Sequence, residues 1–252
     1  MLERLARDPS RAALVVDFDG TLAPIVDHPD EARALPAALE VLAALVLELA
    51  LVGVVSGRAV DFLRDRIGIE GVLLVGQYGL EWLDGDEVRC DARAEPFVDD
   101  VEAVAAEAEA RWPRLVVERK GRLAVALHWR TVPDAAPGGG EVQALADRHG
   151  LDVLPGRMVV ELRPPVPVDK GAAVESLLVD AGVNAAAFAG DDRGDLSAFD
   201  ALDRLVADSR LAAAVRVAVR SEEAPPELLA RADLVVDGPA GLASLLGTLI
   251  GT

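Results

Sequence analysis

The first third of the chain alternates short apolar runs with longer amphipathic segments. The apolar runs at Leu14–Asp17, Leu51–Val55 and Val72–Val75 are rich in Val and Leu and end at turn residues. Such runs are typical of buried parallel strands. The segments between them, Pro36–Ala50 and Val60–Arg66, have helical composition. Strands that alternate with helices over short connections predict a parallel sheet covered by helices.

The middle of the chain has a different pattern, in which pairs of short strands flank turn residues. We predict hairpins around Asp84–Asp86, Arg119–Arg122 and Pro155–Gly156, and helices at Val98–Arg111 and Glu141–His149. Hairpins combined with helices indicate an α+β module and not a continuation of the parallel sheet. We place this insert at residues 92–164, which leaves residues 1–91 and 165–252 for the core.

The alternation of helix and strand resumes after the insert. We predict the following elements: a helix at Ala172–Ala181, a strand at Ala186–Ala189, a helix at Leu196–Leu202, a strand at Val217–Val219, a helix at Pro225–Ala232, a strand at Leu234–Val236 and a last helix. The predicted fold class is therefore α/β, with a Rossmann-like parallel core and an inserted α+β domain.

Composition and charge narrow the classes of partner. The 252 residues are 52% hydrophobic and 27% charged, which is typical of a globular protein with a substantial core. The formal net charge of −18 would repel a polyanion, so we expect no nucleic-acid partner. It does not exclude an anionic substrate, because the local potential of a pocket decides that.

Cysteine usage and hydropathy bear on the compartment. Cys90 is the only cysteine, so neither an intramolecular disulfide nor a thiolate metal site is expected. We find no signal segment and no apolar run long enough for a membrane span; the stretch Leu35–Val52 carries Glu40 and Glu48. We expect a cytoplasmic protein without a membrane partner.

Two carboxylates follow the first predicted strand, in the sequence Asp17-Phe18-Asp19-Gly20-Thr21-Leu22. Side chains two residues apart in an extended chain leave on the same face, and Gly20 allows a sharp turn. Two unpaired acids there attract a hard cation, and Mg²⁺ suits such a site because it needs few carboxylates. The alternative is an Asp-rich turn without chemistry. Further polar residues at the ends of neighbouring predicted strands favour the functional interpretation.

Ser56, Gly57 and Lys170 can complete a phosphoryl-transfer site with these two carboxylates. Asp17 is placed as a nucleophile, and Asp19 as the acid that protonates a leaving oxygen and then as the base for water. Ser56 and the Gly57 turn follow the second strand and can donate to phosphoryl oxygens. Lys170 supplies a cation.

A second acidic segment follows the strand at Ala186–Ala189. Asp191 is the expected third protein contact for Mg²⁺ after Asp17 and Asp19, and Asp192 and Asp195 support it. Ligands gather at the carboxyl ends of parallel strands, so these residues are expected to meet at one edge of the sheet.

This constellation resembles the haloacid dehalogenase superfamily, whose four motifs occur in order at Asp17–Thr21, Ser56, Lys170 and Gly190–Asp195. The insert lies where that superfamily carries a C2-type cap. The resemblance narrows to trehalose-6-phosphate phosphatases through the following segments: Asp17–Ile25, Ser56–Arg58, Val117–Gly121, His128–Arg130, Glu161–Pro164 and Asp169–Gly171.

The resemblance implies that the cap recognises a sugar. The substrate-binding residues that it implies are Thr21, Gly57, Arg58, Glu118, Lys120, Arg130, Glu161 and Arg163. Acids and forked bases suit a ligand made almost entirely of hydroxyls; the alternative for the cap residues is a set of surface ion pairs. The chain departs from the family pattern at Tyr78, where His is usual, and at Gly194 and Leu196, where Thr and Glu are usual.

The expected function is hydrolysis of trehalose 6-phosphate by a Mg²⁺-dependent phosphatase through an aspartyl-phosphate, with a functional link to trehalose-6-phosphate synthase. A phosphatase for sucrose phosphate or a glycosyl-phosphoglycerate is the alternative within the superfamily, and a phosphomutase is less favoured because those carry smaller caps. A non-catalytic partner of the synthase is the alternative from another class.

Overall fold

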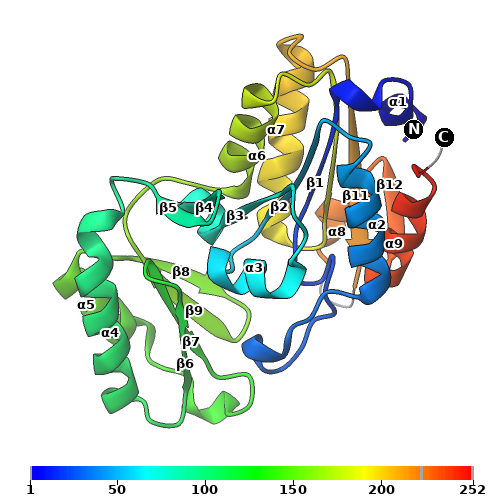
Figure 1. Ribbon diagram of the computed structural model, residues 1–252. Helices are drawn as coiled ribbons and strands as arrows, with labels where there is room; N and C mark the ends of the chain where they lie inside the picture. The colour runs from blue at the N-terminus through cyan, green and yellow to red at the C-terminus, as the bar shows by residue number, and fades with distance from the viewer. Residues whose placement is uncertain (1, 222–223, 251–252) are drawn as a thin grey trace.

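An eight-stranded sheet forms the centre of the larger part of the molecule (Figure 1). The computed structural model describes residues 2–221 and 224–250. The strand order is β12-β11-β10-β1-β2-β3-β4-β5, parallel from β12 to β3 and antiparallel over β4 and β5. The strands are β1 Ala12–Val16, β2 Leu51–Val55, β3 Val72–Gly76, β4 Glu81–Asp84, β5 Glu87–Cys90, β10 Ala185–Gly190, β11 Ala213–Arg220 and β12 Leu234–Asp237.

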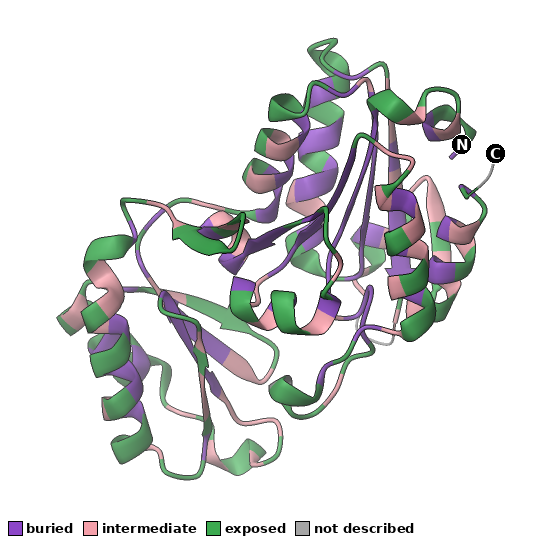
Figure 2. Cartoon of the chain, viewed as in Figure 1, coloured by how far each residue is buried: buried purple, intermediate pink, exposed green. Residues whose placement is uncertain are grey.

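Helices cover both faces of this sheet. In β1, Leu14 and Val16 pack into one apolar cluster and Ala13 and Val15 into another, as a strand buried on both sides requires. The first face carries α1 Glu3–Ala6, α2 Pro36–Val46, α3 Val60–Ile67 and α9 Gly238–Gly247. The second carries α6 Lys170–Asp180, α7 Leu196–Ala207 and α8 Pro226–Arg231. The buried central strands and the exposed outer helix faces are distinguished in Figure 2.

A separate four-stranded antiparallel sheet lies beside the β3–β5 end of the larger sheet (Figure 1). Its order is β6-β7-β9-β8, and two helices cover one face. We call these six elements the cap: α4 Val98–Arg111, β6 Val116–Lys120, β7 Ala124–His128, α5 Gly139–His149, β8 Asp152–Gly156 and β9 Val159–Arg163.

The two faces of the cap sheet differ in chemistry. Val125, Leu127 and Leu162 point to the helix side and pack with α4 and α5. The residues next to them in the strands point to the other side, where Glu118 on β6 and Glu161 on β9 are found. Because side chains alternate across a strand, the apolar face builds the cap core and leaves a polar face opposite.

The predicted fold class is confirmed, with local differences. Strand β11 is longer than predicted because Ala213 and Ala214 extend the ladder against β10, although alanine has a weak strand preference. Helix α6 begins at Lys170 and not at Ala172, since Asp169 caps it by accepting from the Ala172 N–H at 2.8 Å. No helix within the described ranges has the length and hydropathy that a membrane span needs.

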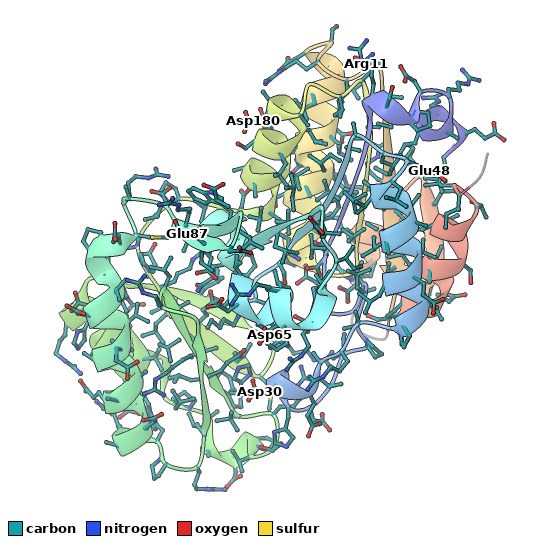
Figure 3. All side chains as sticks on the ribbon, in the orientation of Figure 1. Arg11, Asp30, Glu48, Asp65, Glu87 and Asp180 are labelled. Carbon is teal, nitrogen blue, oxygen red and sulfur yellow. The ribbon has the colours of Figure 1, made fainter. Side chains whose placement is uncertain are left out.

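Much of the acidity is on the outer surface. Asp65, Glu87 and Asp180 are exposed and lie on different parts of the molecule, as the stick view shows (Figure 3). Other acids are buried, and three of these, Asp17, Asp191 and Asp195, lie together at one edge of the larger sheet.

Candidate active site

The carboxyl ends of three parallel strands bring buried polar groups to one edge of the sheet. Asp17 follows β1, Ser56 follows β2 and Asp191 follows β10. Each of these residues is no more than 3% exposed. The Asp17 N–H still donates to the Ala189 carbonyl at 2.9 Å, which continues the β1–β10 ladder and fixes where the Asp17 side chain leaves the sheet. The predicted meeting of these residues is therefore observed.

Lys170 enters the same cluster from the start of α6. Its ammonium nitrogen lies 2.9 Å from Asp17 Oδ1, 2.7 Å from Asp195 Oδ1 and 3.8 Å from Asp192 Oδ1. The residue is 3% exposed. Burial lowers the pKa of Lys170, but the carboxylates of Asp17, Asp192 and Asp195 outweigh burial and raise the pKa well above its usual value. Lys170 is therefore a charged group held inside the site.

Asp195 is held by its own loop. Its Oδ2 accepts from the N–H groups of Asp191 and Asp192, both at 2.9 Å, and its Oδ1 accepts from Lys170 at 2.7 Å. Asp192 caps the same turn by accepting from the Asp195 N–H at 3.2 Å. A Cβ at Gly190 would overlap the Asp195 carboxylate, so this close approach needs glycine. Asp195 thus fixes the backbone that carries Asp191; its supporting role at a metal ion stays a prediction.

Asp191 lies against the turn that follows Asp17. The Thr21 hydroxyl donates to Asp191 Oδ1 at 3.5 Å, and Thr21 is fully buried. Gly20 has a φ of +73°, and a Cβ there would overlap the Asp191 carboxylate. The structure therefore places the Thr21 side chain beside an acid; the substrate contact proposed for Thr21 stays a prediction.

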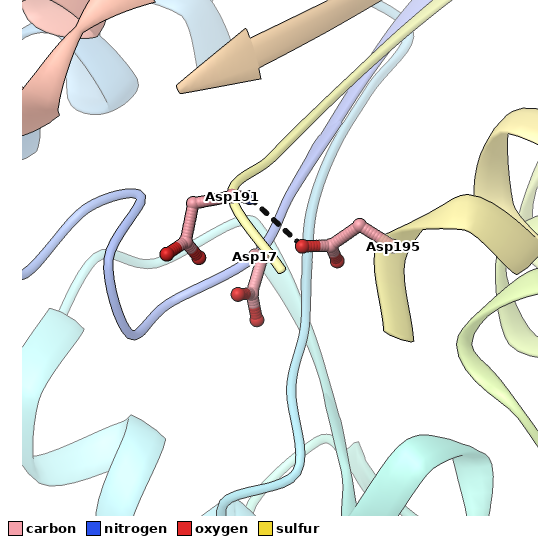
Figure 4. A group of neighbouring side chains, drawn as sticks. All are labelled: Asp17, Asp191 and Asp195. Carbon is pink, nitrogen blue, oxygen red and sulfur yellow. Dashed lines mark hydrogen bonds between the residues drawn. The ribbon is translucent and has the colours of Figure 1, made fainter. Parts of the chain in front are cut away.

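The carboxylates of Asp17, Asp191 and Asp195 lie close enough together to hold a metal ion (Figure 4). Each offers an oxygen within 4.8 Å of the others. Burial and the neighbouring carboxylates of Asp195 and Asp192 raise the pKa of Asp191 to about 8. Burial also raises the pKa of Asp17 well above its usual value, although Lys170 opposes it. Oxygen donors with excess negative charge fit a hard divalent cation.

Asp19 lies apart from this group. Arg58 donates two hydrogen bonds to Asp19, from Nε to Oδ2 at 2.7 Å and from Nη2 to Oδ1 at 2.8 Å. The side chain of Asp19 is 37% exposed, whereas that of Asp17 is 5% exposed. Asp19 as a metal contact therefore stays a prediction, and the group of acids that lie close enough together to hold an ion comprises Asp17, Asp191 and Asp195.

Across the cleft, the polar face of the cap sheet carries paired charges. Lys120 Nζ lies 2.5 Å from Glu161 Oε2, and the side chains are 13% and 6% exposed. Glu118 Oε1 accepts from Arg58 at 3.0 Å, and Glu118 Oε2 lies 2.7 Å from His128 Nε2. Burial raises the pKa of Glu118, but His128, Lys120 and Arg58 outweigh it and the net shift is downward.

A cleft of about 700 Å³ separates the two sides. The predicted residues that line it are Asp17, Asp19, Ser56, Gly57, Arg58, Glu118, Lys120, Arg130, Glu161, Lys170, Asp191 and Asp192. Arg163 instead approaches the Tyr78 ring, with 5.4 Å from Cζ to the ring centroid, and donates to the Val168 carbonyl at 3.5 Å. The volume is in the range of small-molecule sites.

Sequence reasoning missed several lining residues. Tyr78, Arg157 in the β8–β9 turn, and the segment Ile25–Asp27 all border the cleft. A Cβ at Gly57 would lie 2.6 Å from the Tyr78 hydroxyl, so the ring packs on the Ser56–Gly57 turn. The signal that could have marked Tyr78 was its place directly after β3, next to two other functional strand ends.

The fold is that of haloacid dehalogenase-like proteins with an inserted cap. Its structure resembles that of a haloacid dehalogenase-like hydrolase from Bacteroides thetaiotaomicron, with a TM-score of 0.64 and 15% identity over 94% of this chain and 99% of that one. It also resembles the C-terminal domain of Candida albicans trehalose-6-phosphate phosphatase, with a TM-score of 0.75 and 22% identity. The match covers 99% of this chain and 95% of that domain.

Residues 15–228 match the trehalose-phosphatase family, and the chain belongs to that family. The trehalose-phosphate phosphatase of Mycobacterium tuberculosis is 36% identical over 207 residues, which cover 78% of this chain and 52% of the relative. An uncharacterised glycosyl hydrolase from the same species is 36% identical over 206 residues, or 76% of this chain and 15% of that protein. The chain thus spans about half the length, or less, of these relatives.

Proposed function

We propose that this chain is a Mg²⁺-dependent phosphatase that hydrolyses trehalose 6-phosphate to trehalose and phosphate. The family membership supports the activity and the sugar. The observation that carries the chemistry is the buried group of Asp17, Asp191 and Asp195 around Lys170. Lys170 lies within 3.8 Å of the acids Asp17, Asp192 and Asp195, and Asp191 adds a fourth acid beside them, so the acidic groups outnumber the ammonium and suit a divalent cation.

In the proposed reaction, Asp17 attacks the phosphorus and forms an aspartyl-phosphate. Asp19 gives its proton to the sugar oxygen that leaves and then accepts a proton from the attacking water. Ser56 and the Gly57 amide donate to phosphoryl oxygens, and Lys170 balances charge on the transferring group. Asp17, Asp19 and Asp191 are the proposed Mg²⁺ contacts, with Asp192 and Asp195 in support; when bound, the ion would neutralise phosphoryl oxygens and the carboxylates around it.

The polar face of the cap is proposed to bind the sugar. Glu118 and Glu161 accept from hydroxyls, while Lys120 and Arg130 donate to hydroxyls or phosphate. The supporting observation is that Glu118, Lys120, Arg130 and Glu161 line the cleft opposite Asp17. Arg163, whose guanidinium lies against the Tyr78 ring, is likewise proposed to donate to hydroxyls or phosphate.

We also propose a division into two domains, a compartment and a source of the substrate. The core comprises residues 1–91 and 165–252 and the cap residues 92–164, which is supported by the end of the large sheet at Cys90 and its return after α6. The protein acts in the cytoplasm. It takes its substrate from the reaction of trehalose-6-phosphate synthase.

The test is release of inorganic phosphate, with Mg²⁺ and with a chelator, from trehalose 6-phosphate, sucrose 6-phosphate, glucose 6-phosphate and a glucosyl-phosphoglycerate. Metal-dependent release with preference for trehalose 6-phosphate is expected. Preference for another member would keep the Asp17 chemistry and reject the sugar. No release from any of them by folded protein would reject the activity and favour a regulatory role.

A further inference from the structure

Arg58 connects the core to the cap through three charged contacts. Its Nε and Nη2 bind the two oxygens of Asp19, at 2.7 and 2.8 Å, and its Nη1 binds Glu118 on β6 at 3.0 Å. All three guanidinium nitrogens thus donate to carboxylates, and these contacts fix the plane of the guanidinium between Asp19 and Glu118. The arrangement suits a residue that positions other groups.

The surroundings of Arg58 hold the guanidinium in place. Its Cζ lies 4.6 Å from the centroid of the Phe62 ring, a cation–π distance. Its backbone N–H donates to Ser56 Oγ at 3.2 Å, and its carbonyl accepts from the Gln77 N–H at 2.9 Å. The side chain is 11% exposed. The proposed acid–base group is therefore held by a rigid partner.

Glu118, the cap residue that Arg58 contacts, is also held in place by its neighbours. Glu118 uses one oxygen for Arg58 and the other for His128, and its side chain is 13% exposed. Glu118 lies on β6, which pairs with β7 at Glu118 and Ala126. A chain of contacts thus runs from the cap sheet through Arg58 to Asp19.

The orientation of Asp19 matters for its proposed role. Its two oxygens accept from two nitrogens of one guanidinium, so the carboxylate cannot rotate without breaking one of these hydrogen bonds. A group that takes a proton from water has to lie within hydrogen-bond reach of that water, so its position decides how well it acts. The geometry therefore suits the positioning of Asp19 by Arg58.

We propose that Arg58 is a positioning residue for the hydrolysis of the aspartyl-phosphate: it holds Asp19, the proposed base, in place, and Glu118 of the cap anchors Arg58. Water attacks the phosphorus, its proton passes to Asp19, the bond from phosphorus to the Asp17 oxygen breaks, and phosphate leaves. The electron pair of the broken bond returns to the Asp17 carboxylate. This inference rests on the proposed phosphatase function.

The test uses p-nitrophenyl phosphate with the full chain and Mg²⁺. Its leaving group needs no proton, so formation of the aspartyl-phosphate does not depend on Asp19, whereas hydrolysis does. In Arg58→Gln we expect a fast burst of p-nitrophenol that matches the enzyme concentration, followed by steady turnover about 100-fold below wild type, the cost of a misplaced base. Acid-quenched enzyme should carry phosphate on Asp17.

Three variants sharpen the test. Arg58→Lys keeps the charge but cannot span both Asp19 oxygens and Glu118, so it should show the same burst. Glu118→Gln should show a smaller burst of p-nitrophenol than Arg58→Gln and Arg58→Lys. Arg66→Gln is the matched control, because Arg66 also stacks on Phe62, at 4.7 Å, but donates to the carbonyls of Ala32 and Asp30 and not to Asp19. It should behave as wild type.

The outcomes separate the inference from the function on which it rests. A raised KM in folded Arg58→Gln and Arg58→Lys, with kcat unchanged and no phosphoenzyme, would overturn the positioning role and make Arg58 a binding residue. A lowered kcat without phosphoenzyme would overturn it as well. Failure of wild type to release phosphate from both p-nitrophenyl phosphate and trehalose 6-phosphate would instead reject the phosphatase. Should Arg58→Gln not fold, Arg58→Lys and Glu118→Gln carry the same readout.

Discussion

The two sides of the cleft carry buried charges that are arranged in opposite ways. On the core side, Lys170 pairs with Asp17, Asp192 and Asp195, and Asp191 lies beside these acids, so acidic groups are in excess. On the cap side, Lys120 pairs with Glu161, and Glu118 lies between Arg58 and His128, so charges are matched. A site with excess negative charge calls for a cation, whereas a matched site offers hydrogen bonds without strong net attraction.

This difference fits the two parts of a sugar phosphate. The phosphoryl group is anionic and would meet the cation at the core edge, while the sugar is neutral and would meet paired donors and acceptors on the cap. Chemistry and recognition are then separated across the cleft, and substitutions on the two sides should have different consequences.

The largest expected effect is that of Asp17→Asn. We expect turnover to fall by about 10⁴-fold or more, since the proposed nucleophile is removed. The fold should persist, because Lys170 keeps its contact with Asp195 at 2.7 Å. Phosphate release measures turnover, and circular dichroism measures whether the fold persists. Retained turnover would show that Asp17 is not the nucleophile.

Lys170→Met should destabilise the core more than any surface substitution. Removing one partner of a buried charged cluster costs about 3 kcal/mol or more, because the carboxylates are left uncompensated. Arg204→Met is the control: its ion pair with Glu175 is exposed, and we expect a loss of about 0.5 kcal/mol or less. Urea unfolding gives both free energies, and similar small losses would contradict the account.

The metal-free protein should lose stability as the pH rises. Asp191 has a folded-state pKa of about 8, above its ordinary 3.8, so the folded state binds its proton more tightly. This contribution is complete below the unfolded pKa and is lost as the pH rises through about 8. Asp191→Asn should remove this loss of stability with rising pH. Thermal unfolding in chelator across this pH range measures it, and identical slopes for both proteins would contradict it.

Saturating Mg²⁺ should reverse that loss. Binding to the folded state alone adds about 2.7 kcal/mol at a hundred times the Kd. We expect the stabilisation in wild type and a much smaller one in Asp191→Asn, measured by unfolding at fixed pH. Equal stabilisation of the two proteins would place the ion elsewhere.

Gly20→Ala should have a smaller effect that is confined to the core side. The new Cβ would displace the Asp191 carboxylate and weaken Mg²⁺ binding, in addition to a cost of about 1–2 kcal/mol for the left-handed backbone. Gly85→Ala is the control, because Gly85 has a φ of +60° but no atom within 4 Å of the added Cβ. Weakened Mg²⁺ binding in Gly85→Ala, or unchanged binding in Gly20→Ala, would contradict this interpretation.

The sequence predicted the core side of the cleft better than the cap side. Asp17, Ser56 and Asp191 were predicted correctly as strand-end residues because short apolar runs mark parallel strands, and such strands share their carboxyl edge. The saturation of both Asp195 oxygens was not predictable, because it depends on the path of one loop. The contacts of Arg58 with Asp19 and Glu118 were not predictable either, because they depend on how the cap is placed against the core.

The central claim is that the core performs the chemistry and the cap reads the sugar. The most direct measurement is kcat/KM for trehalose 6-phosphate and for p-nitrophenyl phosphate, side by side, in wild type, Lys120→Gln and Arg119→Gln. Arg119 is the neighbouring residue but pairs with Glu102 and Glu109 on the outer side of the cap. The account predicts that Lys120→Gln lowers the value for trehalose 6-phosphate alone and that Arg119→Gln changes neither. An equal fall for both substrates in Lys120→Gln would contradict it.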